Sequence, residues 1–131
     1  MDTATAARRW ASTLREVWPA SSPATFFDLY ADGSVYRTVP GGTVEDGREH
    51  MNRALTLGDP HPDVWIGEPV VVGDRAVVEW WVVATIEGAE HSFAGSAWLR
   101  FDDSGLIVEE HDYWRQFEGR VEPWPGWAGI S

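Results

Sequence analysis

Residues 106–117 read Leu-Ile-Val-Glu-Glu-His-Asp-Tyr-Trp-Arg-Gln-Phe, and this stretch decides how the rest of the chain is interpreted. It follows the turn residues 102–105 and is rich in branched and aromatic side chains, which predicts a β-strand. Alternation places Glu110, Asp112 and Trp114 on one face of this strand. If that face is buried, desolvation raises the pKa of the Asp112 carboxyl and suits it to proton transfer. The alternative is a charged strand edge in water.

Three helices are predicted ahead of the later strands. Apolar residues at helical spacing predict the first helix over residues 3–18, which Pro19 ends. Ser22-Pro23 predicts the start of a second, short helix that runs through Tyr30. A short strand is expected over residues 34–39. The third helix is expected over residues 45–57, with Gly58 as its stop.

Four strands are then expected in succession, over residues 63–72, 75–87, 91–102 and 106–117. Their candidate two-residue turns are Gly73-Asp74, Gly88-Ala89 and Ser104-Gly105. Helices followed by a meander of strands predict an α+β domain, with the helices packed on one face of an antiparallel sheet. We expect one domain over residues 1–131, with an irregular tail over residues 118–131.

Counting inward from these turns predicts which residues lie opposite one another in the sheet. One row contains Gly67, Trp80, Ala97 and Asp112, and the next contains Trp65, Val82, Gly95 and Trp114. The face that carries both rows is overwhelmingly apolar, so we expect the helices to cover it. Ala97 and Gly95 are too small to fill the space above them, which predicts a cavity. The alternative is that helix side chains fill that space.

Composition excludes several classes of function. A formal net charge of −11 argues against nucleic acid or an anionic membrane as partner. The sequence has no cysteine, and its four histidines do not have the spacing of a metal site, so we expect neither a metal nor a cofactor. A cytoplasmic location is expected because no signal peptide or membrane-spanning run is found.

The order of elements and several motifs resemble the SnoaL-like branch of the nuclear transport factor 2-like superfamily, whose members form a cone of curved sheet closed by helices. The closest enzyme pattern is that of limonene epoxide hydrolase. Tyr36 matches its tyrosine, Thr38 stands where it has asparagine, and Asp112 matches the aspartate that activates water. The central strand departs from this pattern, because Trp80 and Val82 replace an arginine and the aspartate that acts as general acid. The departure weighs against epoxide hydrolysis.

The residues and the resemblance together predict a small cofactor-independent enzyme that performs acid/base chemistry on a hydrophobic small molecule. The reaction would be an isomerisation, a cyclisation or a hydration. Asp112 would be the general base or acid, and Tyr36 and Thr38 would orient substrate or water. The expected wall of the cavity consists of Trp65, Trp80, Val82, Phe93, Trp114, Phe27, Met51 and His50. The alternative function is a noncatalytic ligand-binding or dimerisation module.

Two further expectations concern charged and aromatic residues beside this site. Glu110 shares the face of Asp112, and either pairs with it or lies solvated at the rim. Trp81 and Trp98 fall on the opposite face of the sheet, where exposed tryptophans indicate an interface. Because superfamily members commonly dimerise through that face, a homodimer is expected.

Overall fold

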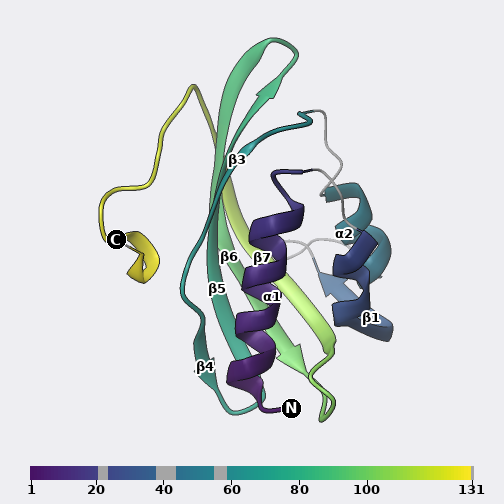
Figure 1. Cartoon of the computed structure of the whole chain (residues 1–131). Coiled ribbons are helices and arrows are strands. Elements are labelled where there is room, and N and C mark those ends of the chain that lie inside the picture. Colours follow the sequence, from purple (N-terminus) through teal and green to yellow (C-terminus); the bar gives the residue numbers. More distant parts are fainter. Residues whose placement is uncertain (21–23, 38–43, 55–58, 131) are drawn as a thin grey trace.

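The computed structural model describes residues 1–20, 24–37, 44–54 and 59–130, and it has the α+β architecture that the sequence predicts. Figure 1 shows a curved sheet with α1 (Thr3–Val17) and α2 (Gly47–Ala54) on its concave side. The predicted second helix is a 3-10 helix, η1 (Ala24–Leu29), so three α-helices are not found among the described residues. No helix in the described ranges has both the length and the apolar character needed to cross a membrane.

The sheet is mixed, and the expectation of a purely antiparallel sheet is therefore wrong. Its strand order is β2-β1-β7-β6-β5-β3, with β4 also paired to β5. The strands are β1 (Tyr30–Arg37), β2 (Val44–Asp46), β3 (Asp63–Ile66), β4 (Val70–Val72), β5 (Arg75–Ile86), β6 (Ala89–Phe101) and β7 (Ile107–Glu118). β1 runs parallel to β7, whereas the other pairs are antiparallel. Side-chain alternation predicts which face of a strand is buried, but it does not predict which strand lies beside it. The sequence of β1 therefore does not indicate its parallel pairing with β7.

The pairing of β6 with β7 is as predicted up to Arg100, because Ala97 lies opposite Asp112 and Gly95 lies opposite Trp114; the predicted two-residue turn is longer, and a register shift after Arg100 places Phe101 opposite Ile107. The pairing of β5 with β6 differs by two residues. The turn consists of Glu87 and Gly88, which both have positive φ (53° and 82°), so Trp80 lies opposite Gly95 rather than Ala97. A shift of two residues keeps every side chain on its predicted face. The apolar face with Asp112 therefore remains as expected.

The predicted strand over residues 63–72 is interrupted between β3 and β4, and this changes one face assignment. Ile66, not Gly67, lies opposite Trp80, because the residues between the two strands shift the register by one. Pro69 in the interruption has no backbone N–H to donate to a ladder. A shift of one residue turns Trp65 to the convex face, so its assignment to the cavity wall is wrong.

α1 covers the concave face of the sheet because one side of this helix is apolar. Asp2 caps its N-terminus by accepting a hydrogen bond from the Thr5 amide at 2.8 Å. Its buried residues are Ala6, Ala7, Trp10, Ala11, Leu14 and Val17, and they join the main core with side chains from β5, β6 and β7. The space between α1, α2 and the sheet holds the candidate site.

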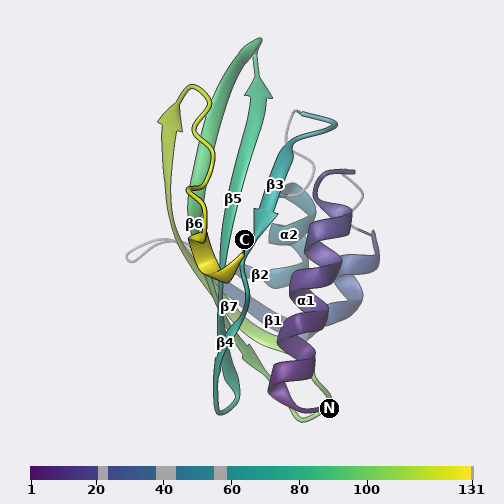
Figure 2. The same ribbon diagram turned by 60° about the vertical axis from the view of Figure 1, so that its left-hand side comes forward.

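The tail after β7 returns across the convex face of the sheet and ends in η2 (Trp127–Gly129), as Figure 2 shows. Trp81, which projects from this face, is only 7% exposed because the tail covers it. Its indole N–H donates to the Val121 carbonyl at 2.7 Å, and its ring packs edge-on against Trp127. The expectation that Trp81 is exposed is therefore wrong.

Candidate active site

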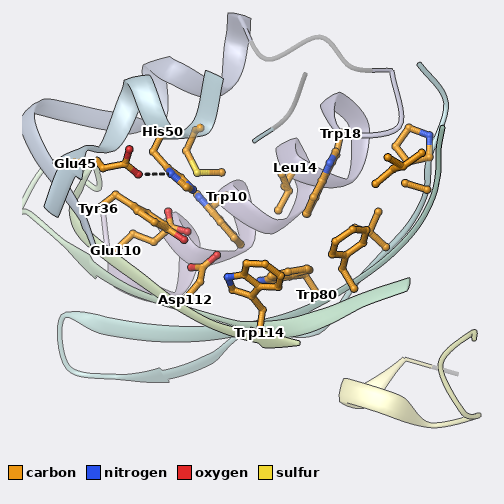
Figure 3. Close-up of a pocket in the computed structure, with 16 residues that line it drawn as sticks. Trp10, Leu14, Trp18, Tyr36, Glu45, His50, Trp80, Glu110, Asp112 and Trp114 are labelled. Atoms are coloured by element: carbon orange, nitrogen blue, oxygen red, sulfur yellow. Dashed lines mark hydrogen bonds and ion pairs between the residues drawn. The ribbon is translucent and has the colours of Figure 1, made fainter. Parts of the chain in front are cut away.

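A cavity of about 430 Å³ lies between the helices and the concave face of the sheet (Figure 3). This is large enough for a small organic ligand. The lining residues are Trp10, Leu14, Trp18, Tyr36, Glu45, His50, Met51, Pro62, Trp80, Val82, Ala84, Ile86, Phe93, Glu110, Asp112 and Trp114. Most of them are apolar, and the polar ones, from β1, β2, α2 and β7, gather at one end.

Two carboxyl groups on β7 form the centre of this polar end. Glu110 is 1% exposed and Asp112 is 9% exposed, and the two side chains project from β7 onto the same face, two residues apart. Burial raises the pKa of both groups, and the negative charge of Glu110 raises the pKa of Asp112 further. Glu110 Oε2 and Asp112 Oδ1 are buried without a donor among the described residues, so a proton retained by the pair would meet part of this need.

A relay of hydrogen bonds from α1 reaches Glu110. The Trp10 indole N–H donates to the Tyr30 hydroxyl at 3.0 Å, and that hydroxyl donates to Glu110 Oε1 at 2.5 Å. Burial and the neighbouring Glu110 raise the pKa of Tyr30 well above its usual value, so its hydroxyl keeps its proton and acts as donor. Donation to Glu110 favours its ionised form, which leaves the shared proton of the pair on Asp112.

Tyr36 and His50 lie on the other side of the carboxyl pair. Tyr36 is the β1 partner of Glu110 in the parallel ladder, and it lines the cavity together with Asp112. Burial and the charge of Asp112 raise the pKa of Tyr36. The His50 ring stacks on Tyr36 with centroids 3.4 Å apart, and its Nδ1 lies 2.9 Å from Glu45 Oε2. The site therefore gathers the proton donors and acceptors Glu45, His50, Tyr36, Glu110 and Asp112 at one end of the cavity (Figure 3).

Most residues predicted for the site line the cavity. Asp112 and Tyr36 lie at its polar end, while Trp80, Val82, Phe93, Trp114, Met51 and His50 form parts of its wall. Trp65 and Phe27 do not line it. Trp65 packs on the convex face, and the half-buried Phe27 follows Phe26, which is the member of that pair packed against Trp10. Thr38 falls outside the described residues.

Several lining residues were not predicted. Glu110 had been left between a paired and a solvated position, and its burial resolves this in favour of the pair. Trp10 and Trp18 were considered as fillers of the cavity, whereas they line it. Glu45 was expected at the start of a helix but belongs to β2, whose pairing to β1 brings it beside His50. No periodicity in a three-residue strand signals that position.

Metal coordination has no support in the described part of the chain. No group of three or more histidine, aspartate or glutamate side chains there has an arrangement that could hold an ion. The acidic residues instead lie at one end of the cavity, whose other walls are formed mainly by apolar side chains.

A curved sheet that shields a cavity under N-terminal helices defines a class of α+β domains, and comparison identifies the family. The chain belongs to the SnoaL-like domain family, whose model matches residues 8–110. This confirms the resemblance seen in the sequence. No curated protein matches the chain.

Three solved structures illustrate the shared fold. A putative SnoaL-like polyketide cyclase from Jannaschia sp. has a TM-score of 0.67 at 13% identity, covering 87% of this chain and 88% of that one. An LEH-like epoxide hydrolase from M. tuberculosis has a TM-score of 0.65 at 21% identity, and the match covers 85% of this chain and 84% of that one. The third is a protein with a ketosteroid isomerase-like fold from Catenulispora acidiphila, in complex with trimethylamine. Its TM-score is 0.64 at 21% identity, and the match covers 79% of this chain and 83% of that one. Identities this low establish the fold alone.

The convex face differs from the predicted interface. Trp81 is covered by the tail, but Trp98 is 37% exposed and Tyr113 beside it is 42% exposed. The His111 ring stacks on Trp98 with centroids 5.9 Å apart. The homodimer stays a prediction, and the surface available for it consists of these exposed rings rather than Trp81.

Proposed function

We propose that this protein is a small cofactor-independent enzyme that moves protons on an apolar small molecule bound in the cavity. The observation that carries the proposal is the buried carboxyl pair, Asp112 and Glu110, at the polar end of an otherwise apolar cavity. Buried carboxyls with raised pKa values can hold and release protons near neutral pH, as acid/base catalysis requires. Isomerisation and cyclisation both consist of such transfers.

The geometry distributes the roles within the pair. Asp112 points into the cavity, where a ligand would meet it, and Glu110 lies on the same face with its carboxyl held by Tyr30 (Figure 3). In the resting site Asp112 carries the shared proton and can donate it to a substrate oxygen. Asp112 then becomes a carboxylate beside the ionised Glu110, which favours return of a proton from the substrate. Tyr36 lies at the same polar end of the cavity and would orient the bound substrate.

Epoxide hydrolysis is disfavoured by the central strand. Trp80 and Val82 line the cavity where the hydrolase pattern has an arginine and an acidic group. Their side chains neither balance a carboxylate charge nor protonate a leaving oxygen. Rearrangement of a carbonyl compound needs only the groups that the pair and the tyrosines supply.

The proposal is tested by proton exchange, which does not require the natural substrate. A cyclic ketone such as 2-tetralone is incubated with the protein in D₂O, and loss of its α-protons is followed by NMR. We expect Asp112→Asn to reduce the exchange rate by about 10²- to 10⁴-fold. Glu109→Gln is the matched control, because Glu109 lies on the convex face and pairs with Arg37. Equal exchange by the wild type and Asp112→Asn would remove Asp112 from the mechanism.

One observation favours a noncatalytic ligand-binding module as the second candidate. The cavity retains its apolar wall although the acid of the hydrolase pattern is replaced by Val82. Such a module would bind the ketone with no acceleration of exchange in the wild type, so the same NMR experiment separates the two functions.

A further inference from the structure

The cavity combines negative groups with aromatic rings. Its carboxyls belong to Glu45, Glu110 and Asp112, and its rings belong mainly to tryptophans. Trp18 and Trp80 form one wall, with ring centroids 5.6 Å apart. Among the described lining residues, His50 alone can carry a positive charge, and it already binds Glu45. The interior is therefore suited to a positive ligand and unfavourable to an anion.

The described arginine side chains lie outside the cavity. The chain contains no lysine, so all its long basic side chains are arginines. Arg37 pairs with Glu109 on the convex face. Arg48 binds Asp32 and the Tyr30 carbonyl. Arg15 binds the Ile66 carbonyl. No described arginine lines the cavity. Among the side chains that the structure describes, none supplies a long basic group to the carboxyl pair.

Unmet hydrogen-bonding capacity points to the same kind of ligand. Glu110 Oε2 and Asp112 Oδ1 are buried acceptors that no described donor reaches. A shared proton supplies one hydrogen between them. A protonated amine supplies up to three hydrogens and a full positive charge, whereas a neutral ketone or ether brings no hydrogen to these two oxygens.

The aromatic wall adds a second attraction for a cation. The faces of tryptophan rings attract ammonium groups electrostatically, and the attraction grows when water is excluded. Trp80 is 7% exposed and Trp10 is 1% exposed, so these rings are largely shielded from solvent. The same wall accommodates the hydrocarbon part of a ligand.

We propose that the ligand of this cavity is a protonated organic amine on an apolar, compact skeleton. Its ammonium group would bind Glu110 and Asp112, and its hydrocarbon would fill the wall of tryptophans. The proposal names the substrate class of the function proposed above and rests on it for the chemistry. The ammonium would donate to the unpartnered oxygens of the two carboxyls, while Asp112 keeps the shared proton that the proposed chemistry uses.

The test compares two ligands of nearly equal shape. 1-Adamantylamine is protonated at neutral pH, and 1-adamantanol is its neutral counterpart. Isothermal titration calorimetry is performed on the wild type, Glu110→Gln, Asp112→Asn and the control Glu109→Gln. We expect the amine to bind about tenfold more tightly than the alcohol to the wild type and to Glu109→Gln. Both cavity variants should lose this preference while they still bind the alcohol.

Three results would overturn the proposal: equal or weaker binding of the amine, binding of neither ligand, or an amine preference that survives both cavity variants. Circular dichroism confirms that each variant is folded, and the two cavity variants serve as independent checks. The exchange of ketone protons is measured on the same samples. Exchange without amine preference would refute the substrate class alone, whereas amine preference without exchange would refute the catalysis alone.

Discussion

Asp112 and Glu110 show how the neighbours of a side chain set its chemistry. Both follow the alternation of β7 onto the concave face, and both are removed from water by the packing of α1 and the helical turns above them. Two buried carboxylates on the same face of one strand are costly to ionise together, so we expect the folded protein to retain a proton that the unfolded chain releases.

This retained proton predicts a pH dependence of stability. Because the folded pKa values are raised, the folded state binds more protons than the unfolded state above about pH 4, and the free energy of unfolding falls as pH rises. The slope is about 1.4 kcal/mol per pH unit for each retained proton. Urea unfolding between about pH 5 and pH 8 should show that the double variant Glu110→Gln/Asp112→Asn lacks this slope.

The comparison between the wild type and the double variant isolates the contribution of Glu110 and Asp112 to the pH dependence of stability. Carboxyls whose pKa is lowered, such as Asp102, which accepts a hydrogen bond from the Leu106 amide, contribute the opposite slope equally to both proteins. The stability of the double variant relative to the wild type should therefore rise with pH. A constant difference across the range would show that the pair is not protonated in the folded state.

At the residue scale the sequence predicted the side chains that alternation alone can place. Asp112, Trp114 and Trp80 were assigned to the correct face, because a slip of two residues at the Glu87-Gly88 turn preserves the faces. The burial of Glu110 depends on Tyr30, which lies 80 residues earlier in the chain. No local pattern contains that partnership.

The elements differ in how much of them local chemistry determines. α1 follows from its apolar stripe and its Asp2 cap, whereas the predicted β6–β7 register holds because a bulge after Arg100 compensates for a turn one residue longer than expected. The β5–β6 turn was misplaced because Glu87 adopts a positive φ that glycine usually provides. The break between β3 and β4, and the parallel partner of β1, depend on long-range packing and were not predictable from periodicity.

Gly95 on β6 provides a prediction at the scale of the sheet. A Cβ atom at this position would collide with the Tyr113 carbonyl and lie 2.6 Å from the Trp114 Cβ on the neighbouring strand. We expect Gly95→Ala to lower the free energy of unfolding by about 1–3 kcal/mol, measured by urea denaturation. Ser96→Ala, on the next residue and the opposite face, adds no atoms and should have a much smaller effect. Equal effects would place the cost outside the β6–β7 contact.

At the scale of the whole molecule, the sheet is covered on both faces by different parts of the chain. The helices cover the concave face and the cavity, while the tail covers Trp81 on the convex face. The Glu68 amide also donates to the Ala128 carbonyl at 2.9 Å, which ties the tail to the interruption between β3 and β4. The tail therefore belongs to the folded structure.

Removal of one buried ring from the tail tests this role. Trp127 is 3% exposed, so we expect Trp127→Ala to lower the free energy of unfolding by about 3–5 kcal/mol. Trp124 is 63% exposed, and Trp124→Ala is the matched control, with an expected effect below about 1 kcal/mol. Thermal or urea unfolding measures both. If Trp127→Ala and Trp124→Ala were both as stable as the wild type, the tail would contribute little to the stability of the fold in solution.

The parallel pairing of β1 with β7 also has a consequence for the order in which the protein is made. During synthesis β1 and β6 emerge before β7, so the edges that β7 will occupy remain unpaired until residue 118 leaves the ribosome. Closing a contact as distant as Tyr30 to Glu110 is slow compared with forming a hairpin. The polar end of the cavity therefore forms late, and a nascent chain carries two open strand edges and an incomplete cavity.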